Sequence, residues 1–408
     1  MDFFNVVTID EGRKLILENF NEFELETELV NILDAVDRTL AVDVISDINV
    51  PEFNRSTVDG YGIMVEDSHG ATQTIPSILN ILGEVKMGEI SNIKIRPGEA
   101  IYIPTGAMVP EGATGVIMIE NTEKMGEDTL LLNKPISKGE NMVYIGDDIK
   151  KDELTLEKGR VINAEVVGTL AALGISKVEV YKKPRFYIIS TGDEIIDIDE
   201  ELTPGKIRDI NSYALQVLVE KAGGEVVNKS IIKDNYELLR GEVAKALESS
   251  DIVLISGGSS VGTRDYTDKV INSFGGKGVL SHGLSIKPGK PTIIGDCDGK
   301  LVIGLPGHPV SSIIVFMALI EDYMDKKLGN KKIRPAIMAT MEYNFPSSPG
   351  RETYQMVKLR YEDGKYYATP THGKSGMISL LSQSQGYIVI KLHEEGIYKG
   401  EERQVFLL

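Results

Sequence analysis

Residues 251–262, DIVLISGGSSVG, join a short apolar run to a loop of glycine and serine residues. An apolar run of this length is typical of a strand that is buried on both faces, as in a parallel sheet. Similar runs predict further strands at 185–190, 225–232, 292–295 and 301–305. Segments with helical spacing separate them, at 211–222, 235–248, 265–274 and 308–326. Strands that alternate with helices predict a parallel-sheet α/β domain.

The loops that follow these predicted strands carry the unusual residues of the domain. A parallel α/β sheet binds its ligands beyond the carboxyl ends of its strands. We expect five loops to share that edge: Ser190–Glu194, the segment at Asp234, Ser256–Gly262 followed by Asp265, Lys287–Pro291 and Gly304–Pro309. Taken singly, each loop also fits a structural role, such as a tight strand–helix turn or a helix cap.

The residue types in these loops favour recognition of phosphate together with a divalent cation. Backbone N–H groups of a glycine-rich loop before a helix can bind an oxyanion, and lysines neutralise its charge. Carboxylates suit a phosphate site if Mg²⁺ stands between the two groups. The residues predicted to bind the ligand are Asp234, Ser256, Gly257, Gly258, Ser259, Ser260, Lys287, Lys290, Pro306 and Gly307, with Glu194 and Asp265 as further acids.

The rest of the chain predicts additional domains. A helix is expected at 8–20, capped by Thr8 or Asp10, and another at 161–173 that ends at Gly174. Short β runs with turn signals fill 75–145, and the tail from 331 returns to strands, with a turn at 362–364. The predicted domains are a discontinuous N-terminal domain (1–45 and 146–178), a β-rich second domain (46–145), the α/β domain (179–328) and a C-terminal β domain (329–408).

Composition narrows the class of protein. The formal net charge is −17, and so acidic a surface repels nucleic acids and anionic membranes. The longest strongly apolar run, Ile313–Ile320, is too short to span a bilayer. The N-terminus has no basic region of the kind a signal peptide needs. The single cysteine, Cys297, sits in a predicted hairpin turn and excludes an internal disulfide. We expect a soluble, cytoplasmic protein.

Several strings in the chain match one known family, in the family's order. They are STVDGYG at 56–62, PTGA at 104–107, PEGA at 110–113, STGDE at 190–194, SGGSSVGTRDYTDK at 256–269, IKPGKP at 286–291 and GLPGHPVS at 304–311. With these motifs the chain resembles the molybdopterin molybdenumtransferases, the MoeA proteins, and the E domain of gephyrin. The motifs span most of the chain, and the family also has the interrupted N-terminal domain. The resemblance implies that this first domain is a dimerisation and linker domain and that the C-terminal domain is β-barrel-like.

The resemblance implies an activity and a set of site residues. It implies insertion of molybdate into adenylylated molybdopterin, with release of AMP, in a step that depends on Mg²⁺ or another divalent ion. It implies a homodimer whose site joins the α/β domain of one subunit to the β-rich domain of its partner. By motif, Asp59, Glu194 and Asp265 fall on catalytic positions, and these three with Asp148 on metal positions. Thr105, Asp234, Lys287 and Ser375 fall on substrate-binding positions.

Three departures from the family pattern stand out. Val143 and Gly283 occupy positions where the family often has arginine and lysine, and His308 replaces a common asparagine. Histidine is a poorer helix cap than asparagine, yet the spacing favours a helix-start residue over a ligand for His308. The choice between molybdate and tungstate, which are tetrahedral dianions of nearly equal size, stays open.

Two other functions compete with molybdenum insertion. A molybdopterin adenylyltransferase would share the SGG-type loop and the α/β domain, and such an enzyme is also a candidate partner. It would lack the β-rich insertion and the C-terminal β domain. A gephyrin-like scaffold without turnover would not need the full set of acids.

Overall fold

The computed structural model describes residues 6–20, 25–257, 266–330, 334–347 and 349–408. The chain folds into two compact units. The first, which we term the α/β–barrel unit, comprises Met1–Val42, Lys158–Asn163 and Lys177–Leu408. The second, the β-rich unit, comprises Asp43–Glu157 and Ala164–Ser176.

The centre of the first unit is a six-stranded sheet in the order β16-β13-β17-β21-β20-β18. Its strands are β13 (Arg185–Thr191), β16 (Glu225–Ile232), β17 (Ile252–Ser256), β18 (Gly278–His282), β20 (Ile293–Cys297) and β21 (Lys300–Leu305). The first four strands in the order are parallel, as predicted, and β20 runs antiparallel to both of its neighbours. The antiparallel step arises because Asp298 and Gly299 form the predicted tight hairpin turn, both with positive φ.

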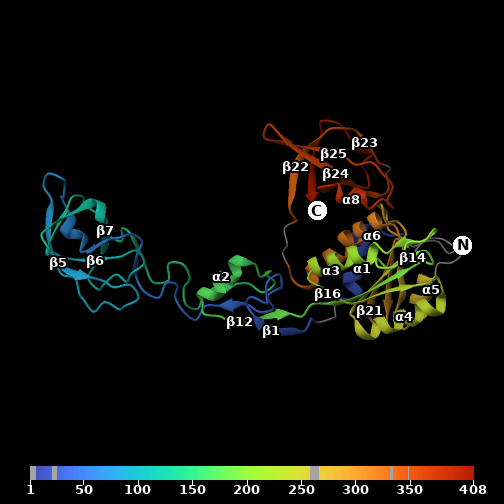
Figure 1. The fold of residues 1–408 in the computed structure, drawn as a ribbon, viewed down its shortest axis with the longest axis horizontal. Coiled ribbons are helices and arrows are strands. Elements are labelled where there is room, and N and C mark those ends of the chain that lie inside the picture. The colour runs from blue at the N-terminus through green and yellow to red at the C-terminus, as the bar shows by residue number, and fades with distance from the viewer. Residues whose placement is uncertain (1–5, 21–24, 258–265, 331–333, 348) are drawn as a thin grey trace. The chain divides into compact units, whose positions relative to one another are not determined.

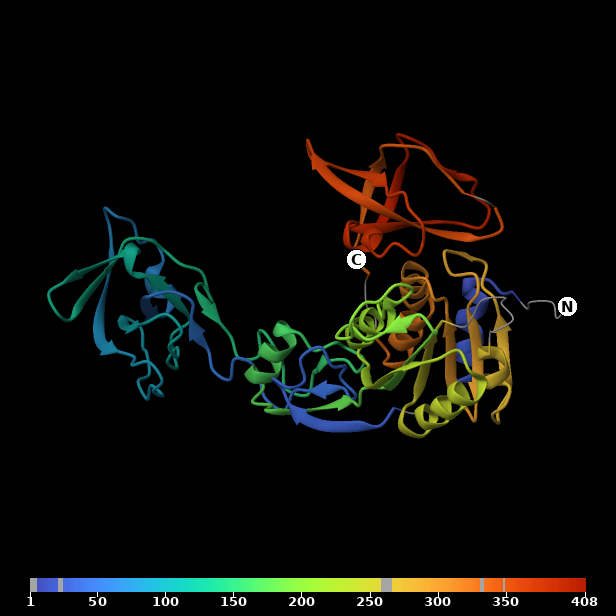
Figure 2. The same cartoon turned by 45° about the vertical axis from the view of Figure 1, so that its right-hand side comes forward.

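Helices cover both faces of this sheet, as Figures 1 and 2 show. Alternate residues of the strands point to opposite faces, so Phe186 and Ile188 belong to one core and Tyr187 and Ile189 to another. The first core is closed by α3 (Asn211–Lys221), α6 (Pro309–Val315), a π-helical turn η3 (Phe316–Ile320) and α7 (Glu321–Lys327). The second is closed by α4 (Tyr236–Ser249) and α5 (Thr267–Ile271). The predicted α/β domain is therefore confirmed.

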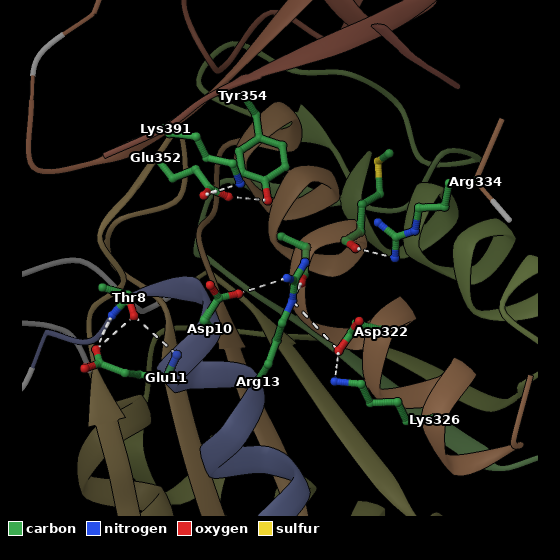
Figure 3. A network of polar contacts seen from close by, with 12 residues as sticks. Thr8, Asp10, Glu11, Arg13, Asp322, Lys326, Arg334, Glu352, Tyr354 and Lys391 are labelled. Atoms are coloured by element: carbon green, nitrogen blue, oxygen red, sulfur yellow. Dashed lines mark hydrogen bonds and ion pairs between the residues drawn. The ribbon is translucent and has the colours of Figure 1, made fainter. Parts of the chain in front are cut away.

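The N-terminal helix α1 (Ile9–Asn19) packs into the first of these cores through Ile9 and Ile16. Thr8 caps it in a capping box with Glu11, which confirms Thr8 over Asp10. Arg13 donates from Nε to the carbonyl of Ala318 in the π-helical turn at 2.8 Å, a contact drawn in Figure 3. The structure thus joins α1 to the α/β sheet, whereas the sequence places it in a domain spanning 1–45.

The C-terminal segment closes into a barrel. Its strands are β22 (Ala336–Met341), β24 (Glu352–Glu362), β25 (Lys365–Pro370), β26 (Gly386–Ile390) and β28 (Glu402–Leu407). The order β24-β25-β22-β28-β26 returns to β24, because β24 also pairs with β26. The predicted turn at 362–364 joins β24 to β25. Outside the ring lie β23 (Phe345–Pro346), β27 (Gly396–Ile397) and the short helix α8 (Ser379–Ser382).

The β-rich unit contains a second six-stranded sheet, in the order β7-β4-β6-β5-β9-β8. Its strands are β4 (Gly60–Ile63), β5 (Ser77–Glu84), β6 (Glu99–Ile103), β7 (Gly115–Met118), β8 (Thr122–Met125) and β9 (Thr129–Leu132). The 3₁₀ turns η1 (Val65–Ser68) and η2 (Ile119–Asn121) and the two-stranded pairs β3 (Arg55–Ser56) with β10 (Met142–Val143) and β2 (Val44–Ile45) with β11 (Leu154–Leu156) accompany it. The predicted β-rich region is confirmed.

The remaining elements are two short strand pairs and one helix. Strand β1 (Thr27–Asn31) pairs with β12 (Lys177–Tyr181), and Leu40 donates its N–H to the carbonyl of Arg160 at 2.9 Å. Helix α2 (Ala164–Ala172) is followed by Gly174, which has φ of 72° as expected of a C′ glycine. Strands β14 (Ile195–Ile196) and β15 (Ile207–Arg208) form a small parallel pair. No helix among the described residues is long and apolar enough to cross a membrane.

Candidate active site

The strands of the α/β sheet end in register, which brings the predicted loops to one edge. Ser190 pairs with Ser256, and Ser256 pairs with Leu305. On the antiparallel side, Ile293 pairs with both Gly304 and His282. The loop at 283–292, which links β18 to β20, therefore leaves from this edge too. The described parts of all five predicted loops therefore begin at this edge.

The acids of the first two loops lie next to each other. Thr191 at the end of β13 donates its hydroxyl to the Oδ1 atom of Asp234 at 2.6 Å. The N–H of Asp234 in turn donates to Oδ1 of Asp193 at 3.3 Å. Glu194 is exposed, and its carboxylate lies over Gly192, where an added Cβ atom would approach Oε2 within 2.9 Å. These contacts bring Asp234 to the loop that carries Glu194.

The loop that follows β17 lies close to the end of β13 and to the loop that follows β21. Gly257 has φ of 102°, and a Cβ atom there would lie 2.3 Å from the carbonyl oxygen of Thr191. The side-chain amide of Asn211 donates to Oγ of Ser256 at 2.6 Å and to the carbonyl of Gly307 at 2.9 Å. Ser256 is buried and is held by this contact. Sequence reasoning assigned Asn211 only to the start of a helix and missed its role between the loops.

Four predicted residues, Gly258, Ser259, Ser260 and Asp265, lie outside the described residues. Their assignment to oxyanion and metal binding therefore stays a prediction. The described members of this loop, Ser256 and Gly257, occupy the edge as expected.

A pocket of about 460 Å³ opens beside the loop at 286–291. Strand β19 (Ile286–Lys287) pairs in parallel with β24 of the barrel, so barrel residues form the opposite wall. The polar and charged residues that line it are Lys287, Lys290, His308, Ser311, Arg351, Thr353, Tyr354, Gln355, Thr371, His372 and Ser375. Pro306 also lines the pocket. Four predicted residues, Lys287, Lys290, Pro306 and Ser375, thus share one cavity.

The lining of this pocket is positively charged. Lys287, Lys290 and Arg351 all line it, no carboxylate does, and within the described chain none of the three cations has an ion-pair partner. Glu352, the residue after Arg351 and the first residue of β24, is buried. Its carboxylate accepts hydrogen bonds from Nζ of Lys391 at 3.1 Å and from the Tyr354 hydroxyl at 3.0 Å (Figure 3). In a chain with a net charge of −17, this is a local site for an anion.

His308 and Ser375 connect the two walls of the pocket. Nδ1 of His308 lies 3.0 Å from Oγ of Ser375, and the N–H of Val310 donates to the Ser375 carbonyl at 3.1 Å. His308 holds the N-cap position of α6, as predicted, but its side chain makes no capping hydrogen bond. Arg351 and His372 were missed because they lie on barrel loops with no motif.

The predicted residues of the β-rich unit form a separate pair. The backbone N–H and the hydroxyl of Thr105 donate to Oδ1 of Asp59 at 2.7 and 2.9 Å. Residues 60 and 103 pair across β4 and β6, which places Asp59 and Thr105 at the ends of adjacent strands. The two bonds from Thr105 lower the pKa of the Asp59 carboxyl. Burial and the neighbouring Asp59 carboxylate raise the pKa of Tyr102.

The predicted metal ligands are not gathered in one described cluster. Asp148 is exposed, and its backbone N–H donates to the carbonyl of Val50 at 3.1 Å. Among the described residues, no group of three His, Cys, Asp or Glu side chains is arranged to hold a metal ion. The metal set of Asp59, Asp148, Glu194 and Asp265 therefore stays a prediction, and its last member lies outside the described part of the chain.

Models of known protein families match three successive segments that together span most of the chain. A model of the MoeA N-terminal region (domains I and II) matches residues 7–174, and a model of a probable molybdopterin-binding domain matches 187–326. A model of the MoeA C-terminal region (domain IV) matches 338–408. The chain belongs to the MoeA family. The family's C-terminal region contributes Arg351, His372 and Ser375 to the basic pocket.

Individual MoeA relatives match over nearly the full length. The chain is 35% identical to a putative molybdopterin biosynthesis protein of Methanocaldococcus jannaschii, covering 99% of this chain and 98% of that protein. It is 30% identical to the molybdopterin molybdenumtransferase of Haemophilus influenzae, with 97% of both chains covered. The crystal structure of a MoeA molybdopterin biosynthesis protein from Pyrococcus horikoshii matches with a TM-score of 0.81 at 35% identity, covering 98% of this chain and 99% of that one.

Proposed function

We propose that this chain is a molybdopterin molybdenumtransferase, which inserts molybdate into adenylylated molybdopterin and releases AMP. The observation that carries the proposal is the basic pocket of Lys287, Lys290 and Arg351, which no carboxylate lines. Relatives matched over nearly the full length bear the name molybdopterin molybdenumtransferase. An enzyme that joins an oxyanion to a phosphate-bearing substrate needs a site with this charge.

The pocket suits a tetrahedral oxyanion. Its three cations line two walls, Lys287 and Lys290 on one and Arg351 on the other, so an anion between the walls would gain charge-assisted hydrogen bonds from both. The ring of His308 and the hydroxyl of Ser375 supply further polar atoms at the rim. The oxyanion in this proposal is molybdate, and tungstate has the same charge and nearly the same size.

The proposal includes a divalent cation such as Mg²⁺, and the exposed acids fit it. Within the described chain the Glu194 side chain makes no hydrogen bond or ion pair, and the two hydrogen bonds to the Asp59 carboxylate both go to Oδ1, so Oδ2 accepts none. Free carboxylate oxygens are the ligands that Mg²⁺ prefers. The cation would neutralise phosphate charge beside these acids, while Asp234 is held in place by Thr191.

We further propose a homodimer as the working form. The residues assigned by motif divide between the two units, and a second copy offers a way for both sets to act on one substrate. Large apolar side chains are exposed on the first unit, including Leu33 at 74%, Ile207 at 54% and Val217 at 52%. In a symmetric dimer these side chains are candidates for burial at the interface. Sedimentation as a species of about 45 kDa, the mass of one chain, would contradict the dimer.

The experiment is an assay of AMP release from adenylylated molybdopterin. The proposal expects AMP release that requires both molybdate and the divalent cation. Release without molybdate would instead indicate simple hydrolysis, and consumption of ATP to form the nucleotide-linked pterin would indicate an adenylyltransferase. Binding of the substrate without any turnover would indicate a scaffold.

A further inference from the structure

The basic pocket also holds a group whose charge can change near neutral pH. His308, at the start of α6, lines the pocket together with Lys287, Lys290 and Arg351. Histidine is the side chain that ordinarily gains or loses a proton between about pH 5 and 8. Lysine and arginine keep their charge throughout this range. A change of charge in the pocket lining near neutral pH therefore comes from one of its two histidines, His308 or His372.

The His308 ring is held by a residue of the C-terminal barrel segment. Its Nδ1 atom lies 3.0 Å from Oγ of Ser375, and the N–H of Val310 donates to the Ser375 carbonyl at 3.1 Å. The other ring nitrogen, Nε2, has no hydrogen-bond partner within the described chain. Gly376 lies beside that edge of the ring, and even an added Cβ atom there would stay 3.9 Å from Nε2. Nε2 is therefore open to a ligand.

The number of protons on His308 and Ser375 decides what the pair can offer to an anion. The Ser375 hydroxyl carries one proton, and a neutral imidazole carries one, on either Nδ1 or Nε2. If the hydroxyl donates to Nδ1, it has no proton left for an anion. If Nδ1 instead donates to Oγ, the neutral ring has no proton on Nε2. Only the imidazolium lets the hydroxyl and Nε2 both donate to one anion while the contact between Nδ1 and Oγ is kept.

The surroundings of His308 contain no acid that could pair with an imidazolium. The titratable and charged groups that line the pocket with it are Lys287, Lys290, Arg351, Tyr354 and His372. Burial raises the pKa of Tyr354, so this hydroxyl stays neutral. The first turn of α6 carries no acid, and the adjacent Glu352 accepts hydrogen bonds from Lys391 and Tyr354. The counter-charge is therefore the bound anion itself, and an opposite charge nearby favours the charged form of a group.

We propose that His308 is an anion-binding residue of the basic pocket and takes up a proton from solvent when a tetrahedral dianion binds. The proton adds to the imidazole nitrogen that lacks one, and no covalent bond to the anion forms. The proposal rests on the proposed function only for the identity of the anion, molybdate. A dianion should draw in the proton more strongly than a monoanion, because its attraction to the imidazolium is larger.

Calorimetric titration of the full-length protein with molybdate measures this proton uptake. Each titration is repeated at one near-neutral pH in two buffers of different ionisation enthalpy, and the difference in heat gives the number of protons bound per anion. The parental chain is compared with His308→Asn, His372→Asn and His393→Asn. His393 is an exposed histidine of the C-terminal segment that does not line the pocket, so His393→Asn is the matched control.

The parental chain and His393→Asn should take up a proton with molybdate and bind it several-fold more tightly at about pH 6 than at about pH 8. His308→Asn should take up no proton and bind molybdate more weakly, with nearly the same affinity at both pH values. Perrhenate, a tetrahedral monoanion of similar size, should cause a smaller uptake in the parental chain. Equal proton uptake in His308→Asn and the parental chain, or binding without uptake in the parental chain, would overturn the proposal. So would an uptake that is lost in His372→Asn and kept in His308→Asn.

Ser375→Ala tests the proton count. Without the hydroxyl, Nδ1 has no partner and a neutral ring can carry its single proton on Nε2. Molybdate binding should therefore persist in weakened form with a reduced proton uptake. A contact that serves only to link the two walls leaves the uptake as it is in the parental chain, and that result would contradict the proton count.

The AMP-release assay separates this proposal from the proposed function. If molybdate binds with proton uptake through His308 but the parental chain never releases AMP from adenylylated molybdopterin, the anion site stands and the proposed function is wrong. If AMP release requires molybdate while proton uptake is the same in His308→Asn and the parental chain, the function stands and the role of His308 is wrong.

Discussion

Nδ1 of His308 lies 3.0 Å from Oγ of Ser375, and this contact joins the start of helix α6 to a loop of the C-terminal barrel. The two residues are 67 positions apart in sequence. This contact adds a side-chain link between the two walls of the basic pocket, which the pairing of β19 with β24 also joins.

Replacing His308 with alanine removes this link. We expect molybdate affinity to fall several-fold, because a typical hydrogen bond contributes about 0.5–1.5 kcal/mol. The thermal midpoint should change little, since His308 is exposed and caps no backbone group. His308→Asn, which keeps a short polar side chain, should retain more affinity than alanine. A large loss of thermal stability with unchanged affinity would show that the contact serves the fold alone.

Gly257→Ala tests whether the loops at the sheet edge depend on close backbone approach. The new Cβ atom would lie 2.3 Å from the carbonyl oxygen of Thr191, at a φ of 102°. We expect a loss of roughly 1–3 kcal/mol in the free energy of unfolding, measured with urea. Gly205→Ala is the control, because Gly205 also has a positive φ of 86° but open space around it. Equal losses in the two variants would show that φ strain alone matters.

The sequence predicted the position of these loops well and the walls of the pocket only in part. Buried parallel strands have a clear apolar pattern, so their ends, and with them Asp234, Ser256 and Lys287, could be located. Arg351 and His372 could not, because they reach the pocket only through the pairing of β19 with β24. That pairing joins segments 66 residues apart in the sequence, and no local sequence pattern predicts it.

Helix α1 shows a second limit of the same kind. Its apolar spacing predicted a helix and its cap, since both depend on neighbouring residues. The surface on which α1 packs could not be predicted, because the apolar face of a helix can pack against any apolar surface of the protein. In the structure α1 packs on the α/β core through Ile9 and Ile16, and Arg13 adds a hydrogen bond to the carbonyl of Ala318 in the π-helical turn.

Thr105→Val should raise the pKa of the Asp59 carboxyl toward its ordinary value near 3.9, because one of the two bonds that lower it is lost. The backbone bond from residue 105 remains, so the rise should be partial. A pKa lowered by folding stabilises the fold above about pH 4, and this contribution disappears as the pH falls through the folded pKa. Carboxyl NMR titration measures the shift, with Thr57→Val as the control. An unchanged Asp59 pKa would contradict the assigned cause.

Glu194→Gln should raise the Mg²⁺ concentration needed for AMP release, because an amide is a poor replacement for a carboxylate on a hard cation. Raising Mg²⁺ should recover part of the rate. Glu201→Gln, a nearby exposed glutamate that makes no described contact, should behave as the parental chain does. A parental Mg²⁺ dependence in Glu194→Gln would remove Glu194 from the metal site.

The central claim is that the acid-free pocket binds the oxyanion, and calorimetric titration of molybdate at low salt tests it most directly. Lys287→Ala should weaken binding by about 1.5–3 kcal/mol, or roughly 10- to 150-fold, because a charge-assisted contact is lost. Lys374→Ala removes a neighbouring exposed cation that does not line the pocket, and it should bind as the parental chain does. Equal molybdate affinity in the parental chain and Lys287→Ala would contradict the account.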